Sequence, residues 1–230
     1  MEKAHIALAF TTSALLVSFS SSCGGPNESS EPQLPQLMPD SLSTSPCRRL
    51  TKDSDEVITS STRVCTGSYA NVRLIVSGEN IRVSCEGAAP CFLAGPRSGI
   101  IFRNFNNSVF ENIYAIDTAG QQDSGPFPLL RKGVQIINSS NNHISTGAQC
   151  NRAVSNCIGL VLDNVGPSSN NNIIEFTGVS LYTGIYILAG SSNRISYDVS
   201  RVRARDSHGR PICLIDQTKE NKFIAKQCSF

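Results

Sequence analysis

The residues whose types and spacing best suit chemistry lie in SRVRARDSHGR, at 200–210. Three arginines alternate with small or apolar residues, so on an extended strand their guanidinium groups face one way. These are Arg201, Arg203 and Arg205. Such a strip suits the carboxylates of an acidic sugar polymer. Asp206 and His208 follow, and an acid beside a base can serve proton transfer. The catalytic candidates are therefore Arg203, Arg205, Asp206 and His208. A solvent-exposed strand face followed by a polar turn explains the same residues without any function.

Other chemical signals are weak. The chain has no GxSxG, HExxH, CxxC or phosphate-binding glycine loop. Glycoside hydrolysis needs two carboxylates flanking one bond, yet the carboxylates of the strand-forming region are scattered along the chain. Tyr182 and Tyr186 fit either a sugar-stacking platform or packing at a corner of the fold. We expect no metal and no cofactor, and the sequence favours a binding, adhesion or structural role over catalysis.

The N-terminus has the features of an export signal. Lys3 precedes an apolar run at 6–19 that is too short to span a bilayer, and three serines lead to Cys23. This resembles the lipobox of bacterial lipoproteins, in which the chain is cut before a cysteine that becomes lipidated. Ser20 departs from that pattern, which usually has Leu there. The resemblance implies a signal peptide at 1–22 and lipidation at Cys23; cleavage by ordinary signal peptidase, giving a secreted protein, is the alternative.

Residues 23–46 read as the lipidated cysteine and a disordered tether. The stretch 24–46 contains five Pro, five Ser and no Lys or Arg. A segment of this composition cannot bury enough apolar surface to order itself. Gly24, following Cys23 where Asp would retain a lipoprotein in the inner membrane, favours the outer membrane or cell surface.

The nine cysteines of the chain leave one unpaired if the others form disulfides. With Cys23 set aside as the lipidated residue, eight can pair completely, as expected in an oxidising compartment. Eight cysteines allow 105 connectivities. Short sequence intervals favour the local pairs Cys85–Cys91 and Cys150–Cys157. The other four cysteines then pair most simply as Cys47–Cys65 and Cys213–Cys228. Structural zinc is the competing reading, but no CxxC or companion His supports it.

From residue 47 onward the chain repeats one phrase, as in GVQIINSSNNHI at 133–144. Each copy opens with Gly or Pro, continues with alternating apolar residues and closes with Asn before an apolar residue. The last four openings, at 133, 159, 184 and 211, are spaced 26, 25 and 27 residues apart. A period in the twenties with short strands predicts a solenoid whose stacked coils share one core. The recurring asparagines are then expected to hydrogen-bond along the stack. They are Asn112, Asn142, Asn172, Asn193 and Asn221.

These openings and asparagine corners resemble the right-handed parallel β-helix proteins of the pectin-lyase-like superfamily. The resemblance implies an all-β, right-handed parallel β-helix of roughly six or seven coils over 47–230. It says little about function, because that fold hosts lyases, hydrolases, epimerases, adhesins and structural fibres. An antiparallel β-sandwich is the alternative fold.

Charge excludes few partners. Twenty Lys and Arg balance eighteen Asp and Glu, for a net charge of +2, so no nucleic acid is expected. The sequence thus predicts an exported, lipid-anchored cell-envelope protein that binds polysaccharide or another surface protein, or has a structural role. The alternative is a carbohydrate-active enzyme (lyase, hydrolase or epimerase) acting on an acidic polysaccharide.

Overall fold

The computed structural model describes residues 46–119, 131–151, 156–163 and 165–229. The expected signal peptide, Cys23 and nearly all of the expected tether lie outside these residues. Within them the chain is all-β, and no helix there is long and apolar enough to cross a membrane.

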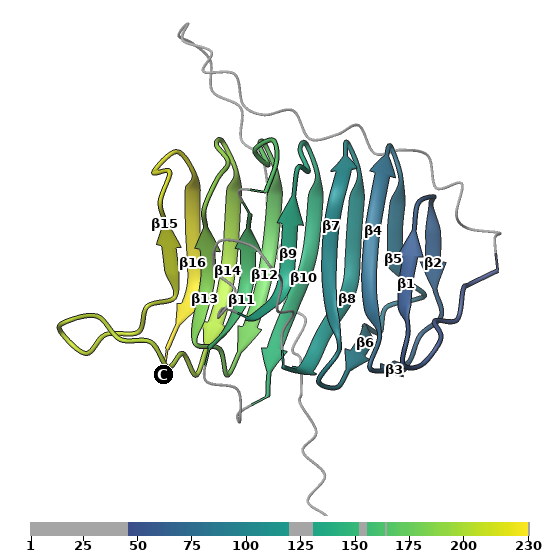
Figure 1. Ribbon diagram of the computed structural model, residues 1–230, viewed down its shortest axis with the longest axis horizontal. Coiled ribbons are helices and arrows are strands. Elements are labelled where there is room, and N and C mark those ends of the chain that lie inside the picture. Colours follow the sequence, from purple (N-terminus) through teal and green to yellow (C-terminus); the bar gives the residue numbers. More distant parts are fainter. Residues whose placement is uncertain (1–45, 120–130, 152–155, 164, 230) are drawn as a thin grey trace, which may run out of the picture. The chain divides into compact units, whose positions relative to one another are not determined.

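Two parallel sheets make up the fold (Figure 1). In sheet order, the seven-stranded sheet consists of β1 (Asp55–Ile58), β4 (Arg73–Glu79), β7 (Gly99–Asn106), β9 (Arg131–Ile137), β11 (Cys157–Leu162), β13 (Thr183–Ile187) and β15 (Leu214–Asp216). The path of the nine-stranded sheet is β16 (Lys222–Cys228), β14 (Arg194–Ser200), β12 (Ile173–Val179), β10 (His143–Cys150), β8 (Val109–Thr118), β5 (Arg82–Cys85) and β2 (Thr62–Val64). Its other two strands are β3 (Ser68–Ala70), which pairs with β6, and β6 (Cys91–Ala94), which also pairs with β8.

The connectivity excludes the antiparallel sandwich. From β7 onward successive strands alternate between the two sheets. Every ladder between these strands is parallel. Each strand therefore lies beside the strand one repeat away in the sequence, not beside its chain neighbour, as the self-similar phrases predict.

Like residues stack on like residues in the core. One buried row of the seven-stranded sheet is Leu74, Ile100, Val134, Leu160 and Ile185. A buried row of the nine-stranded sheet is Val83, Phe110, Ile144, Ile174 and Ile195. Each of these ten side chains is fully buried. Burial of a side chain of this size contributes about 1.5–3 kcal/mol, so these rows are a main source of stability.

The glycines that open three of the phrases, Gly133, Gly159 and Gly184, let the two sheets approach one another. At Gly159, a Cβ atom would lie 2.7 Å from Cζ of Phe176 on the opposite sheet and 2.7 Å from the Gly184 carbonyl oxygen. Any larger residue would push β11 away from β12, which explains why the repeat starts with glycine there.

A buried asparagine ladder runs along the stack. The Nδ2 groups of Asn142, Asn172 and Asn193 each donate to Oδ1 of the next asparagine, at 2.9, 2.9 and 2.8 Å, and the last acceptor is Asn221. Their backbone N–H groups donate to the same oxygens at 3.1, 3.0 and 3.0 Å. This confirms the predicted stacking of four of the five asparagines.

The prediction for the fifth asparagine, Asn112, is wrong. His143 pairs with Val109, so Ser108 occupies the position equivalent to Asn142, and the Ser108 N–H donates to Asn142 Oδ1 at 3.0 Å. Asn112 lies inside β8, where the register with β10 shifts and the backbone is left-handed (φ 60°). Asn112 therefore lies four residues past the corner, which Ser108 occupies, and is the extra residue of a bulge in β8.

Four disulfides fasten the stack, and they are the four pairs that the sequence intervals favour. They are Cys47–Cys65, Cys85–Cys91, Cys150–Cys157 and Cys213–Cys228. The first joins the chain entering the fold to the residue that follows β2, and the last joins the end of β16 to the residue before β15. Covalent links thus hold the outermost strands at both ends.

Candidate functional site

The arginine segment at 200–210 differs from the single strand that its alternation predicts. Val202 and Ala204 are buried as expected. However, β14 ends at Ser200, and Arg201 has a left-handed backbone (φ 56°). Arg203 donates to the Ser180 carbonyl oxygen at 3.4 Å, and Arg205 to the Gly209 carbonyl oxygen at 3.3 Å. Two of the three guanidinium groups thus bind backbone of their own chain, and the three do not form one row on a strand.

Asp206 and His208 belong to a closed turn. Asp206 Oδ1 accepts hydrogen bonds from the backbone N–H groups of His208 and Arg210, both at 2.9 Å, and Oδ2 lies 2.8 Å from Arg210 Nε. The Arg210 backbone bond is the main reason that the pKa of Asp206 lies below its ordinary value. The exposed His208 ring contacts only Ser207 Oγ, at 3.3 Å, among the described residues. These contacts stabilise a turn, and they account for Asp206 and His208 without a catalytic role.

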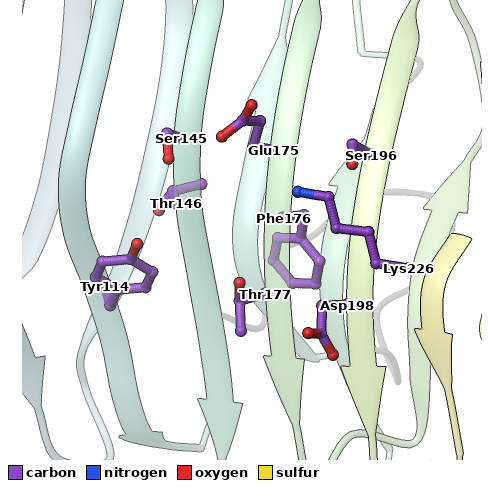
Figure 2. A pocket seen from close by; sticks show the side chains of 9 residues that line it. All are labelled: Tyr114, Ser145, Thr146, Glu175, Phe176, Thr177, Ser196, Asp198 and Lys226. Atoms are coloured by element: carbon purple, nitrogen blue, oxygen red, sulfur yellow. The ribbon is translucent and has the colours of Figure 1, made fainter. Parts of the chain in front are cut away.

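A groove lies instead on the outer face of the nine-stranded sheet (Figure 2), with a volume of about 130 Å³. Five neighbouring strands, β8, β10, β12, β14 and β16, contribute to it. Its lining residues are Tyr114, Ser145, Thr146, Glu175, Phe176, Thr177, Ser196, Asp198 and Lys226. We call this set the groove.

Strand register arranges carboxylates and hydroxyls alternately across the groove. Glu175 on β12 pairs with Ser196 on β14, and two residues further on Thr177 pairs with Asp198. Each carboxylate therefore faces a hydroxyl across the strand gap, and the two carboxylates are diagonal to one another. Strands ~4.8 Å apart and a rise of ~3.3 Å per residue put the two attachment points ~8 Å apart. A small polar ligand can thus contact both acidic groups at once.

An aromatic ring closes one side of the groove. Gly147 on β10 pairs with Tyr114 on β8, and a Cβ at Gly147 would lie 2.9 Å from Tyr114 Cδ1. The ring therefore lies against a glycine, where any other residue would displace it. Burial raises the pKa of the Tyr114 hydroxyl, a hydrogen bond with Ser145 works against this, and the Glu175 charge raises it further. The phenol stays protonated and can donate a hydrogen bond.

A β-bulge supplies the cation. Tyr197 pairs with Ala225, but Asp198 pairs with Gln227, so Lys226 is an extra residue on β16. A bulge re-aims the side chain at its position. In Figure 2 the Lys226 side chain extends over β14, with its ammonium group directed toward β12, the strand of Glu175. The bulge thereby adds a positive charge to the groove that also contains the two carboxylates.

Among the described residues, the three charged groups of the groove form no ion pair. Across the described ranges, Glu175, Asp198 and Lys226 make no hydrogen bond or ion pair with another side chain. Two other carboxylates of the fold are paired: Glu111 with Arg82 at 2.8 Å and Asp163 with the buried Lys132 at 2.5 Å. Charged groups left unpaired on a formed surface are available to make hydrogen bonds to a ligand.

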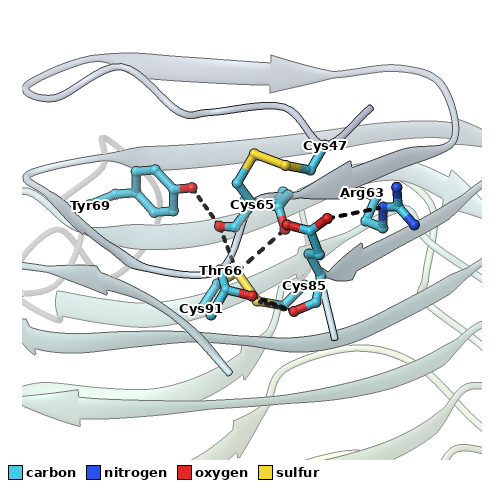
Figure 3. Close-up of a disulfide and its surroundings, with 9 residues drawn as sticks. Cys47, Arg63, Cys65, Thr66, Tyr69, Cys85 and Cys91 are labelled. Carbon is cyan, nitrogen blue, oxygen red and sulfur yellow. Dashed lines mark hydrogen bonds and ion pairs between the residues drawn. A yellow bond between two sulfur atoms is a disulfide. The ribbon is translucent and has the colours of Figure 1, made fainter. Parts of the chain in front are cut away.

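In the described part of the chain, metal-ligating side chains gather away from the groove. The three metal-ligating side chains that gather in the described part of the chain are Cys47, Cys65 and Glu86. Figure 3 shows that the two sulfur atoms are bonded to each other. A disulfide offers no thiolate, and zinc binds cysteine as thiolate, so this group serves as a covalent link.

Sequence reasoning missed the groove because it treated these carboxylates as scattered. Glu175 and Asp198 are 23 residues apart, while the local register is 21 residues (Glu175 to Ser196). The repeat period alone would have placed them within two residues on neighbouring strands, and alternation would have pointed both outward. The predicted stacking candidates lie elsewhere: Tyr182 is exposed, and the Tyr186 hydroxyl accepts a hydrogen bond from Gln217 at 2.7 Å.

No protein-family model, no curated protein and no solved structure matches the chain. The chemistry of the groove itself is therefore the basis for a function.

Proposed function

We propose that the protein binds a hydroxyl-rich carbohydrate in the groove without catalysing a reaction on it. The observation that carries this proposal is the set of unpaired charges, Glu175, Asp198 and Lys226, beside the ring of Tyr114. Sugar hydroxyls both donate and accept hydrogen bonds, and bonds to ionised partners are the stronger ones. The amphipathic tyrosine ring offers an apolar surface to the C–H face of a sugar.

Binding to a glycan array tests this proposal. We expect the full-length chain to bind at least one class of oligosaccharide, and Tyr114→Ala to weaken that binding about tenfold, the scale of truncating a central interface aromatic. Tyr182→Ala is the matched control, because Tyr182 is an exposed tyrosine outside the groove. Absence of any glycan binding, or equal losses in the two variants, would overturn the proposal.

Hydrolysis is the alternative function. The attachment points of Glu175 and Asp198 are ~8 Å apart on neighbouring strands, and glycoside hydrolysis needs two carboxyl groups that flank one bond. The discriminating measurement is release of reducing ends from a bound oligosaccharide. Binding without release supports the non-catalytic function, whereas release that Glu175→Gln abolishes would establish the enzyme.

We also propose that the two sheets belong to one right-handed parallel β-helix of six or seven coils, similar to the pectin-lyase-like proteins. Three observations support it: strands alternate between the sheets, ladders are parallel, and like residues stack. In this fold the outer sheet faces form continuous surfaces along the stack, which suits an extended polymer.

For location, we propose an exported protein anchored by lipid at Cys23, with residues 1–22 as signal peptide and 23–46 as tether, at the outer membrane or cell surface. Four disulfides support an oxidising, non-cytoplasmic compartment. Replacing Cys23 with Ser should move the protein from the membrane fraction to the soluble fraction. Unchanged fractionation would remove the anchor and leave plain secretion.

A further inference from the structure

We infer that the ligand is a zwitterionic glycan, one that carries both carboxylate and ammonium groups. This inference rests on the proposed function and names the ligand class of the same surface.

The first observation is a pair of like charges at the edge of the groove. Arg194 on β14 pairs in register with Lys222 on β16, and both side chains are exposed. Neither makes a hydrogen bond or ion pair through its side chain with any described residue. Like charges directly opposite on neighbouring strands destabilise a sheet. We call these two residues the basic row; their arrangement works against folding and suits an anionic group of a ligand.

The second observation is the position of the basic row relative to the carboxylates. Arg194 and the groove residue Ser196 are two residues apart on β14, so they share the outer face. Ser196 pairs with Glu175. The basic row therefore runs parallel to the row containing Glu175, about 7 Å away along the strands. On the side toward β8 the basic row is flanked by Ile173 on β12 and then by His143 on β10.

Along the strand direction the sign of the unpaired charge consequently alternates. Arg194 and Lys222 come first, then Glu175, then Lys226, and then Asp198. Glu111, the remaining charged residue of the Glu175 row, is neutralised by Arg82. A polyanion would meet the two free carboxylates, and a polycation would meet three free cations. A chain carrying both signs can match both sets.

The magnitude follows from Coulomb's law. A unit charge about 5 Å from an opposite charge in water changes affinity about fourfold. A zwitterionic oligosaccharide that makes one contact of each sign should therefore bind about 15-fold more tightly than its neutral counterpart. At 1 M salt, where the screening length is about 3 Å, most of this advantage should vanish.

One oligosaccharide backbone in four charge forms tests the inference. The probes are a hyaluronan hexasaccharide (anionic), its de-N-acetylated form (zwitterionic), its carboxyl-reduced form (neutral) and the form with both modifications (cationic). Affinity of the full-length chain for each is measured by calorimetry at low and high salt. We expect the zwitterionic form to bind most tightly at low salt.

Two variants assign the contacts. Glu175→Gln should remove the fourfold benefit of the ligand amine, and Arg194→Gln the benefit of its carboxylate, each without affecting the other. Glu79→Gln and Arg49→Gln are the controls, because both residues are exposed and lie away from the groove. Exposed substitutions of this kind change stability little, so the variants should fold.

The outcomes separate this inference from the proposed function. Binding that Tyr114→Ala weakens, but with the anionic, cationic or neutral form preferred, overturns the zwitterion inference and leaves carbohydrate binding in place. If none of the four forms binds and the glycan array is also negative, both fail.

Discussion

Truncation of Asn172 should destabilise the protein far more than truncation of an exposed amide. Asn172 is fully buried and sits in the middle of the asparagine ladder. Its Oδ1 accepts the Asn142 backbone N–H at 3.1 Å, and its Nδ2 donates to the Ser139 carbonyl oxygen at 2.9 Å. Among the described residues, those two backbone groups have no other hydrogen-bond partner. In Asn172→Ala both groups are left buried and unsatisfied.

The expected cost comes from these two groups. Each unsatisfied buried polar group costs about 1–3 kcal/mol, so the free energy of unfolding should fall by about 2–6 kcal/mol. Two neighbours are less affected, because Asn142 Nδ2 keeps the Phe105 carbonyl oxygen and Asn193 Oδ1 keeps the Asn172 backbone N–H. A loss of this size is a large share of the 5–15 kcal/mol typical of a domain.

The assay is urea unfolding followed by far-UV circular dichroism. Gln149→Ala is the matched control: Gln149 is an exposed amide on β10, and its truncation should change the free energy of unfolding by less than about 0.5 kcal/mol. If Asn172→Ala lowers stability by no more than this control, the ladder does not stabilise the stack and the reasoning is refuted.

Three other changes have expected outcomes. Replacing both Cys213 and Cys228 with Ala should lower the free energy of unfolding by about 3 kcal/mol, because the disulfide closes a 15-residue interval; an unchanged urea midpoint would contradict this. Gly147→Ala should weaken glycan binding and cost about 1–3 kcal/mol, since the new Cβ meets backbone oxygen of β12 and the Tyr114 ring; calorimetry with normal affinity would contradict it. Burial works to raise the pKa of Asp216, but hydrogen bonds from Thr218 and Asn221 outweigh it and hold that pKa below 3.8. The stability from Asp216 should therefore be full above about pH 5 and be lost as the pH falls below 3.8. Urea titrations at several pH values should show a smaller acid loss in Asp216→Asn, and an identical loss would refute the assignment.

The repeating phrase was sufficient to predict the main features of the fold. Alternation and period together predicted parallel strands one repeat apart, and the asparagine corners predicted hydrogen bonds from Asn142 to Asn221. These features follow from local sequence, because each repeat pairs with its neighbours through the same strand positions. The prediction for Asn112 is wrong because the corner of that repeat carries Ser108 in place of an asparagine, and Asn112, followed by Ile113, is the next residue that fits the pattern.

Prediction of the groove from the sequence would have required the register between neighbouring strands. Whether Glu175 faces Ser196 or Asp198 depends on a shift of two residues, and the openings of the repeats vary by one or two. The bulge that aims Lys226 is also set by pairing with β14. The arginine strip was the more visible pattern because its three charges lie within five residues of sequence, yet it lies where β14 has already ended. Closeness in sequence is thus a poor guide to a surface made of stacked strands.

The most direct test of the central claim is a crystal structure of the protein with the oligosaccharide that it binds most tightly. The account predicts a sugar ring against Tyr114 and ligand hydroxyls or amines within hydrogen-bond distance of Glu175 or Asp198. Ligand density on the 201–210 segment or on the seven-stranded sheet, with the groove empty, would contradict it.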